Sequence, residues 1–266
     1  MKCIKVWLIT IVIIVSLSFS CTTSIPPATP TPPTLPDPPS NSLKAAIVDQ
    51  LYNLQPNQIF LNQAIQQLEG CGFDVELHQG DAVTVNLYRR LPGYGYDLII
   101  FRAHSGLLAG SEGVINNTCL FTNETYTESR YIGEQLADQL AMARIDKNHP
   151  LVFSINDKFV TDAMEGEFDN TVIIMMGCSC LFLDDLAKAF VAKGASSYIA
   201  WGATVGLGYV DEATVYLLEE LCGENLAIAD AVENTMNTIG PDPQYGAKLK
   251  YYPQPSGDKA LEQLIK

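Results

Sequence analysis

Two residues that could act together in catalysis, His104 and Cys178, each follow a run of apolar residues. His104 comes shortly after YDLIIF at 96–101, and Cys178 shortly after TVIIMM at 171–176. Continuous apolar runs of this length are typical of strands buried on both faces of a parallel sheet, and catalytic groups collect at the carboxyl ends of such strands. If the two strands are neighbours, the imidazole can act as a general base and activate the thiol as a nucleophile.

Backbone amides beside this pair are candidates to stabilise an oxyanion. They belong to Ser105, Gly106 and Gly177, and to Cys178 itself. Glycine has no side chain, so the main chain at such positions can approach a substrate closely. Asp211 begins a predicted helix, where a carboxylate commonly serves as a cap, and its alternative role is to select a basic side chain of the substrate.

Simpler interpretations of the same residues stay open. A cysteine at the end of a buried strand is often a small core residue, and a histidine there is often structural. Cys180 is an alternative nucleophile, although we expect its side chain to lie past the strand edge, outside the cleft. The Cys-X-Cys spacing also occurs in metal sites, but no second Cys or His pair stands at ligand spacing, so we expect no metal and no cofactor.

The segments that must position these residues alternate between short apolar runs and helical periodicity. This order predicts βαβ units around a mainly parallel sheet, with the strands before His104 and Cys178 adjacent, parallel and central. The predicted strands are Leu43 to Val48, Phe73 to Leu77, Tyr96 to Phe101, Thr171 to Met176 and Ser197 to Trp201. The predicted helices are Gln58 to Leu68, Val83 to Leu91, Asp184 to Lys193, Asp211 to Leu221 and Leu226 to Thr238.

Residues 106–169 have a less regular pattern. They predict a hairpin around Val114 to Tyr126 and helices near Ile132 to Met142 and Lys158 to Met164. Element boundaries are the weakest part of a prediction from one sequence.

The N-terminal residues predict export. Lys2 and Lys5 precede about fourteen mostly apolar residues, a length typical of a signal-peptide core and short for a membrane span. Cys21 follows the small Ser20, which resembles a lipoprotein processing site where the cysteine is lipidated and becomes the new N-terminus. An uncleaved anchor and simple secretion are the alternatives, and all three place the following domain on the extracytoplasmic side.

The composition completes the predicted organisation. We expect a signal peptide at 1–20, a lipid-anchored linker at 21–42 that is rich in proline and therefore extended, and one domain at 43–266. The net charge of −14 opposes binding to nucleic acid. The expected partners are a peptide or protein substrate, and a membrane through the N-terminal lipid or apolar anchor.

The cysteine count limits disulfide pairing. Removal of Cys3 with the signal peptide and lipidation of Cys21 would leave five cysteines, an odd number. At least one thiol of a monomer then stays unpaired, as a nucleophile or as an inert buried residue. The remaining cysteines are Cys71, Cys119, Cys178, Cys180 and Cys222.

The chain resembles the caspase-like cysteine peptidases of clan CD, and CHAT domains in particular. IIFRAHSG and TVIIMMGC stand where that family has strands ending in its histidine and cysteine, and DDLAKAFVAKGASSYIAWGATVGLGYVDEATVYLLEEL resembles the run that follows. The resemblance implies a three-layer α/β/α sandwich with a mainly parallel central sheet. It implies a cysteine endopeptidase with His104 as general base and Cys178 as nucleophile. Members of such families can lose activity and persist, so the alternative is an inactive domain that binds peptide or protein partners.

Overall fold

The central sheet of the protein contains six strands in the part of the chain that a computed structural model describes, residues 42–109 and 115–265. The strand order is β10-β9-β8-β3-β1-β2, and all neighbours are parallel except β10, which pairs antiparallel with β9. The strands are β1 Leu43–Asp49, β2 Phe73–Gln79, β3 Leu98–Arg102, β8 Val172–Met175, β9 Ser197–Trp201 and β10 Leu249–Tyr252. The predicted signal peptide, nearly all of the predicted linker and Cys21 lie outside the described residues.

The two strands that precede His104 and Cys178 are neighbours at the middle of this sheet. β3 and β8 pair in parallel register from Leu98 opposite Val172 to Phe101 opposite Met175. Every residue of both strands is buried, as their continuous apolar sequences predict. The expectation of adjacent, parallel and central strands is therefore confirmed.

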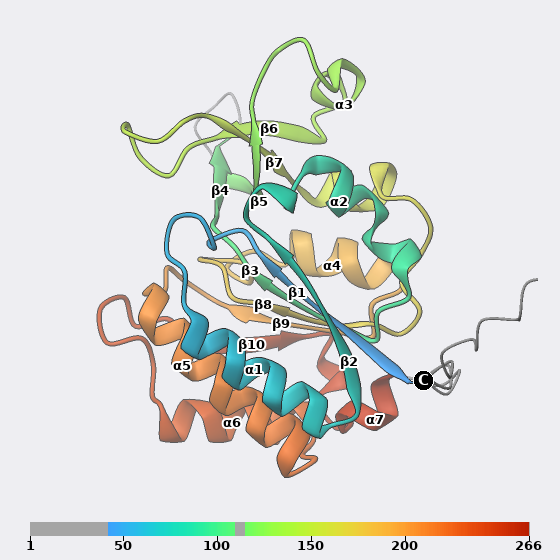
Figure 1. The fold of residues 1–266 in the computed structure, drawn as a ribbon, viewed down its shortest axis with the longest axis vertical. Coiled ribbons are helices and arrows are strands. Elements are labelled where there is room, and N and C mark those ends of the chain that lie inside the picture. The colour runs from blue at the N-terminus through green and yellow to red at the C-terminus, as the bar shows by residue number, and fades with distance from the viewer. Residues whose placement is uncertain (1–41, 110–114, 266) are drawn as a thin grey trace, which may run out of the picture. The chain divides into compact units, whose positions relative to one another are not determined.

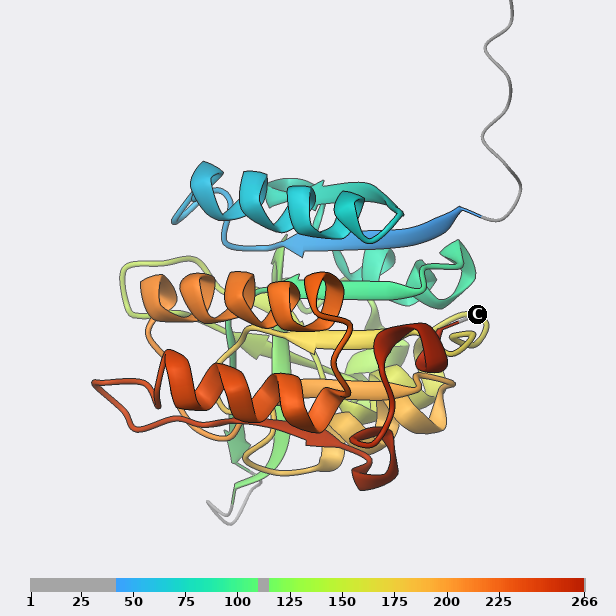
Figure 2. The same cartoon turned by 90° about the horizontal axis from the view of Figure 1, so that it is seen from below.

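Helices cover both faces of the central sheet. α1 (Gln58–Gly70), α5 (Leu207–Leu218) and α6 (Ile228–Thr238) lie side by side over one face (Figures 1 and 2). α2 (Val85–Arg90) and α4 (Asp185–Ala192) pack on the other face, and α7 (Leu261–Leu264) ends the described chain. Alternate residues of β1 and β3 enter two separate cores, one under each layer of helices. The fold is the predicted three-layer α/β/α sandwich with a mainly parallel central sheet.

Local signals explain where the main helices begin and end. The Asn57 side chain accepts a hydrogen bond from the backbone of Phe60 and caps the start of α1, and Gly72 beyond its end has a left-handed φ of 88°. Gly194 follows α4 with a φ of 105°, a conformation that favours glycine. Among the described helices, none is long and apolar enough to cross a membrane.

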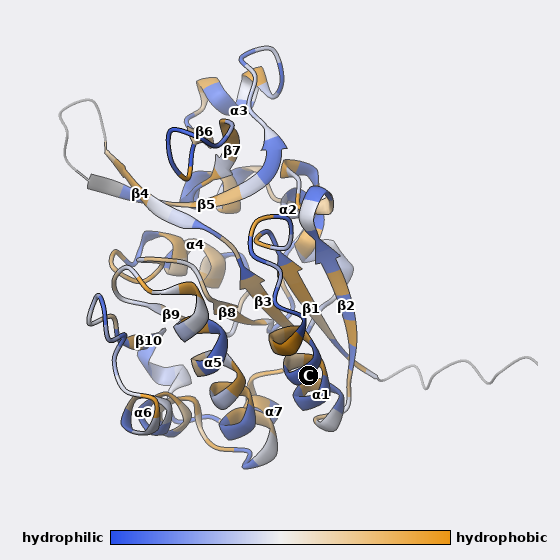
Figure 3. Cartoon of the chain, turned by 60° about the vertical axis from the view of Figure 1, so that its left-hand side comes forward, coloured by the Kyte–Doolittle hydropathy of each residue, from blue (hydrophilic) through white to orange (hydrophobic). Residues whose placement is uncertain are grey.

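The chain segment between β3 and β8 forms a second, antiparallel sheet. Its order is β4-β5-β7-β6, and it stands beside the carboxyl ends of the central strands at the top of Figure 1. In Figure 3, β1 and β3 are mostly hydrophobic, whereas β5 has a mixed pattern. The strands of the second sheet are β4 Ser105–Ala109, β5 Ile115–Thr125, β6 Leu140–Ala143 and β7 Val152–Ile155.

This region departs from the sequence prediction. The predicted hairpin exists, formed by β4 and β5, but it begins earlier than expected. The predicted helix Ile132 to Met142 is wrong in its second half: α3 covers only Ile132–Leu136, and the following residues form β6. Asp138, between the two, has a left-handed φ of 55°, which a helix cannot contain. The predicted helix near Lys158 to Met164 is present as a π-type turn.

Candidate functional site

A groove with a volume of about 860 Å³ opens where the central sheet meets the second sheet. His104, Ser105 and Gly106 line it from the end of β3 and the start of β4, and Cys178 lines it from the end of β8. The structure therefore brings four of the predicted site residues to one concave surface. The other walls comprise Cys119 and Phe121 of β5, residues 142–145, residues 204–208, Gln55, Leu107, Leu108, Gln244 and Tyr245.

His104 is held at the point where the chain passes from one sheet to the other. Its backbone N–H donates to Oε1 of Gln50 at 2.9 Å, and its ring lies 6.0 Å from the ring of Phe121. Burial lowers the pKa of His104, and the nearby charges of His149 and Arg102 lower it further. The imidazole is therefore neutral at neutral pH, which is the form that a general base requires.

Cys178 is only partly buried and is one of the residues that line the groove. The thiol donates to the carbonyl oxygen of Val205 at 3.5 Å, and the Cys178 carbonyl accepts a 2.6 Å hydrogen bond from the hydroxyl of Ser105. Within the described residues, no hydrogen bond joins this thiol to the imidazole of His104. The two groups share a groove, and a change in the thiol's orientation is needed before a proton can pass between them.

The ends of β3 and β8 approach so closely that Gly177 has room for no side chain. A Cβ atom there would collide with the Ser105 hydroxyl and lie 2.8 Å from the Ala103 carbonyl oxygen. Gly177 is not among the residues that line the groove, whereas Ser105 and Gly106 are. Of the predicted oxyanion donors, Ser105, Gly106 and Cys178 belong to residues that line the cavity.

Cys180 lies in a different environment from Cys178. It is fully buried in the core, and burial raises the pKa of its thiol to about 12. Ser179, with a left-handed φ of 57°, turns the chain back into the protein. Cys180 lies past the end of β8 and outside the lining of the groove, as expected, and there it is buried in the core.

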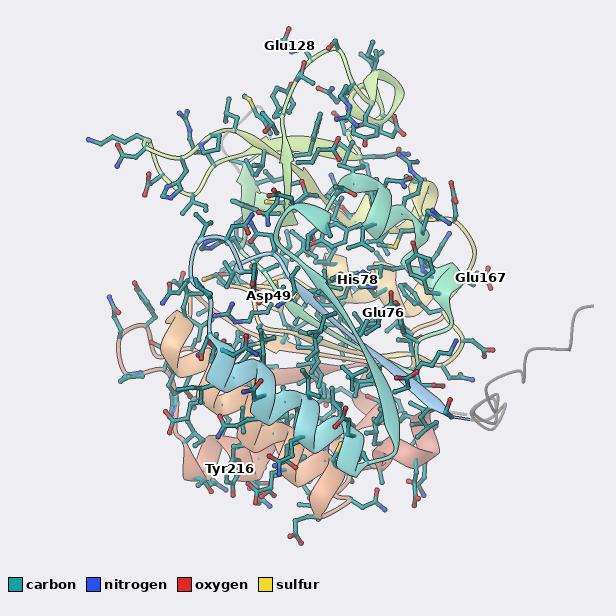
Figure 4. The ribbon with its side chains drawn as sticks, viewed as in Figure 1. Asp49, Glu76, His78, Glu128, Glu167 and Tyr216 are labelled. Carbon is teal, nitrogen blue, oxygen red and sulfur yellow. The ribbon has the colours of Figure 1, made fainter. Side chains whose placement is uncertain are left out.

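Asp211 belongs to a buried ion cluster. Its two carboxylate oxygens accept bonds of 2.8 and 2.9 Å from the guanidinium of Arg102, which also donates to Asp49 at 2.9 Å. Asp49 lies in the interior, where β1 ends (Figure 4), and burial raises its pKa. Asp211 is only 5% exposed and lies outside the groove, so it is not available to a basic substrate side chain. The predicted substrate-pocket role is corrected to a structural one.

Sequence reasoning missed two residues of the site. Gln50 follows β1 and holds the backbone of His104, and Arg144 follows β6 and lines the groove. Gln50 could have been found from its position next to the end of a predicted strand, whereas Arg144 lies two residues past the predicted helix Ile132 to Met142 and had no such signal. No three potential metal ligands gather within residues 42–109 and 115–265.

Comparison with solved structures gives distant likenesses. The chain is similar to the crystal structure of the Arg specific cysteine proteinase gingipain R (RGPB), with 11% sequence identity and a TM-score of 0.45. The match covers 84% of this chain and 45% of that proteinase, so the chain spans less than half of its length. No family model and no curated protein matches the chain. The function is therefore inferred from the geometry of the groove.

Proposed function

We propose that this protein is a membrane-anchored, extracytoplasmic cysteine endopeptidase in which Cys178 is the nucleophile and His104 the general base. One observation supports the proposal most strongly. A thiol and a neutral imidazole, carried by the ends of two adjacent parallel strands, line the same groove, and that groove is large enough to hold several side chains of a peptide.

The groove supplies the parts that acyl transfer needs. The Cys178 thiol turns from Val205 and gives its proton to His104, and the thiolate attacks the carbonyl carbon of a peptide bond. The amides of Ser105 and Gly106 are candidate donors to the oxyanion that forms. The imidazolium then protonates the leaving amine, and an acyl-enzyme remains on the sulfur. Water, deprotonated by His104, hydrolyses this thioester and restores the thiol.

The anchor is part of the proposal and depends on the N-terminal sequence alone. Lys2 and Lys5, the apolar run after them, and Cys21 after a small residue favour cleavage and lipidation. Mass analysis of the protein from its native membrane should show a mature N-terminus at Cys21 that carries lipid. A mature chain that retains Lys2 would favour an uncleaved apolar span.

One observation favours a second candidate function, an inactive domain that binds peptide or protein partners in the same groove. In the described residues, the thiol of Cys178 bonds to a backbone carbonyl and not to His104. A binding module needs the groove but no reactive thiol, whereas a peptidase needs a thiol that electrophiles can reach. The reactivity of Cys178 therefore separates the two functions.

The decisive experiment is covalent labelling with peptides that end in an electrophilic ketone. We expect such probes to modify the full chain at Cys178, because its thiol lines the groove, and we expect Cys178→Ala to abolish both labelling and peptide cleavage. Cys180→Ala is the matched control and should label like the wild type, because that thiol is buried. Labelling that survives in Cys178→Ala but is lost in Cys180→Ala would overturn the assignment of the nucleophile. No labelling by probes with basic, acidic or apolar side chains would favour the binding module.

A further inference from the structure

The lining of the groove carries almost no charge, although the protein as a whole is strongly acidic. The chain has 30 acidic and 16 basic residues and a net charge of −14. Among the described residues that line the groove, Arg144 is the only one with a permanently charged side chain, and no aspartate or glutamate is part of the lining. A ligand in the groove therefore meets a positive charge on the wall that the second sheet forms.

The guanidinium of Arg144 is available to such a ligand. Arg144 is exposed and has no ion pair or hydrogen bond within residues 42–109 and 115–265. Two carboxylates near the lining are already engaged. Oδ1 of Asp146 lies 3.0 Å from Nδ1 of His149, and the buried carboxylate of Asp242 accepts three hydrogen bonds from the backbone of lining residues. Arg144 therefore keeps its donors for a carboxylate brought by the ligand.

Large apolar side chains stand on the walls of the same groove. Met142 of β6 is 59% exposed, and Tyr245, in the segment before β10, is 48% exposed. Single exposed apolar side chains are common on proteins, but these two line one cavity, where a ligand can cover them. Exposure also alternates along the chain at β6, because Ala143 is buried between Met142 and Arg144. An apolar and a cationic side chain are therefore exposed together on this wall.

We propose that the groove selects a peptide segment in which an acidic side chain stands among large apolar ones, and that Arg144 recognises the carboxylate. This inference deepens the proposed function and rests on it, because it takes the groove to be the site where peptide binds. The Arg144 guanidinium donates to the carboxylate, while Met142 and Tyr245 cover apolar side chains of the segment. A basic side chain finds no carboxylate in the described lining and meets a like charge, so basic segments are rejected.

Peptide binding tests this selectivity in the full chain carrying Cys178→Ala, which cannot cleave the peptide. Fluorescent peptides with blocked ends contain leucine and phenylalanine and one variable residue, which is aspartate, asparagine or lysine and is placed at each position in turn. At the best position we expect aspartate to bind most tightly and lysine most weakly, about 5 to 20-fold apart at low salt. The difference should shrink at 1 M salt, where the screening length is about 3 Å. Equal binding at every position, or tightest binding of lysine, would overturn the proposal.

A charge reversal at Arg144 tests the role of this residue, with Lys147 as the matched control. In the same Cys178→Ala chain, Arg144→Glu should reverse the preference, so that the lysine peptide binds most tightly. Lys147→Glu changes the net charge by the same amount, but Lys147 is exposed outside the lining, so this variant should keep the preference for aspartate. Reversal in both variants would mean that overall charge sets the selectivity. An unchanged preference in Arg144→Glu would remove Arg144 from the recognition of the carboxylate.

Met142→Ala tests the apolar part of the proposal. It should weaken binding of all three peptides about 3 to 10-fold and keep their order, because apolar contact is lost and the charge is unchanged. Leu136→Ala is the control, since Leu136 of α3 is 82% exposed and lies outside the lining. It should bind like the parent chain. Equal losses in the two variants, or no loss in Met142→Ala, would contradict the apolar contact.

These measurements separate the selectivity of the groove from the proposed peptidase activity. If the aspartate peptide binds selectively but electrophilic probes do not label the wild type, the selectivity stands and the groove belongs to a binding module. If the probes label Cys178 but the aspartate, asparagine and lysine peptides bind equally, the peptidase stands and the inferred selectivity is wrong.

Discussion

The two sheets of this protein differ in how their strands are buried, and the site lies between them. β3 and β8 of the central sheet are buried along their whole length, whereas β6 of the second sheet exposes Met142 by 59%. The central sheet fixes the strand ends that carry His104 and Cys178. The second sheet adds Arg144 and other residues as a wall of the groove. Changes near the end of β3 should therefore affect folding, and exposed changes in the second sheet should affect only the groove.

The largest effect is expected from Arg102→Ala at the end of β3. This change leaves Asp49 and Asp211 buried without their cation, and breaking a buried ion pair from one side costs about 3 to 5 kcal/mol. Urea denaturation followed by far-UV circular dichroism measures the loss. A cost below about 1 kcal/mol would mean that the ion cluster contributes little to the stability of the central sheet. The two sheets would then differ less in their contribution to the free energy of unfolding than we infer.

His104→Ala should have its main effect on turnover. We expect peptide cleavage to fall about 10² to 10⁴-fold, the usual contribution of a general base, with little change in circular dichroism. A peptide-cleavage assay on both proteins measures this. Cleavage that stays within a factor of about 3 of the wild type would remove His104 from the proposed dyad.

The pH dependence of stability and of the cleavage rate gives a second test of His104. Its pKa lies below the ordinary value of 6.5, so the unfolded chain binds this proton more readily than the folded chain. Protonation therefore favours unfolding, and this residue's effect destabilises the fold progressively as pH falls below 6.5. The acid limb of cleavage rate against pH should lie below 6.5 for the same reason. His104→Ala should weaken the loss of stability on the acid side, and an acid limb above pH 6.5 would contradict the lowered pKa.

Gly177→Ala and Gly106→Ala form a matched pair that tests the close approach of β3 and β8. A Cβ at Gly177 collides with Ser105 and the Ala103 carbonyl, whereas the nearest atoms to a Cβ at Gly106 are 3.9 Å away. Overpacking of this kind costs about 1 to 3 kcal/mol, so we expect that loss for Gly177→Ala and less than about 0.5 kcal/mol for Gly106→Ala. Equal losses in denaturant unfolding would show that the strand ends adjust freely.

Arg144→Ala should have the smallest effect on stability. The side chain is exposed and forms no ion pair within the described residues, so we expect a change within about 0.5 kcal/mol. Thermal unfolding of this variant beside Arg102→Ala compares the two sheets directly. A loss comparable to that of Arg102→Ala would show that the second sheet is as tightly coupled to the core as the first.

The sequence predicts most of the central sheet because strands buried on both faces carry continuous apolar runs. It predicts less of the second sheet, because the half-exposed strand Leu140–Ala143 is short and consists of leucine, alanine and methionine, which favour helices, and the left-handed turn at Asp138 has no strong sequence signal. His104 and Cys178 could be placed together because both follow strand ends. The ion pair between Arg102 and Asp211 could not, because its partners are 109 residues apart and each has a plausible local role.

The insertion of the second sheet between β3 and β8 also has a consequence for the order of folding. β1, β2 and β3 are contiguous at residues 43–102, so they can pair through short connections, whereas β8 must close a much longer loop to reach β3. We infer that the groove is completed late, after the first three strands have formed. Reactivity of Cys178 towards the peptide probe during refolding should therefore appear after amide protons of β1 and β3 become protected from exchange, and simultaneous appearance would argue for a single concerted step.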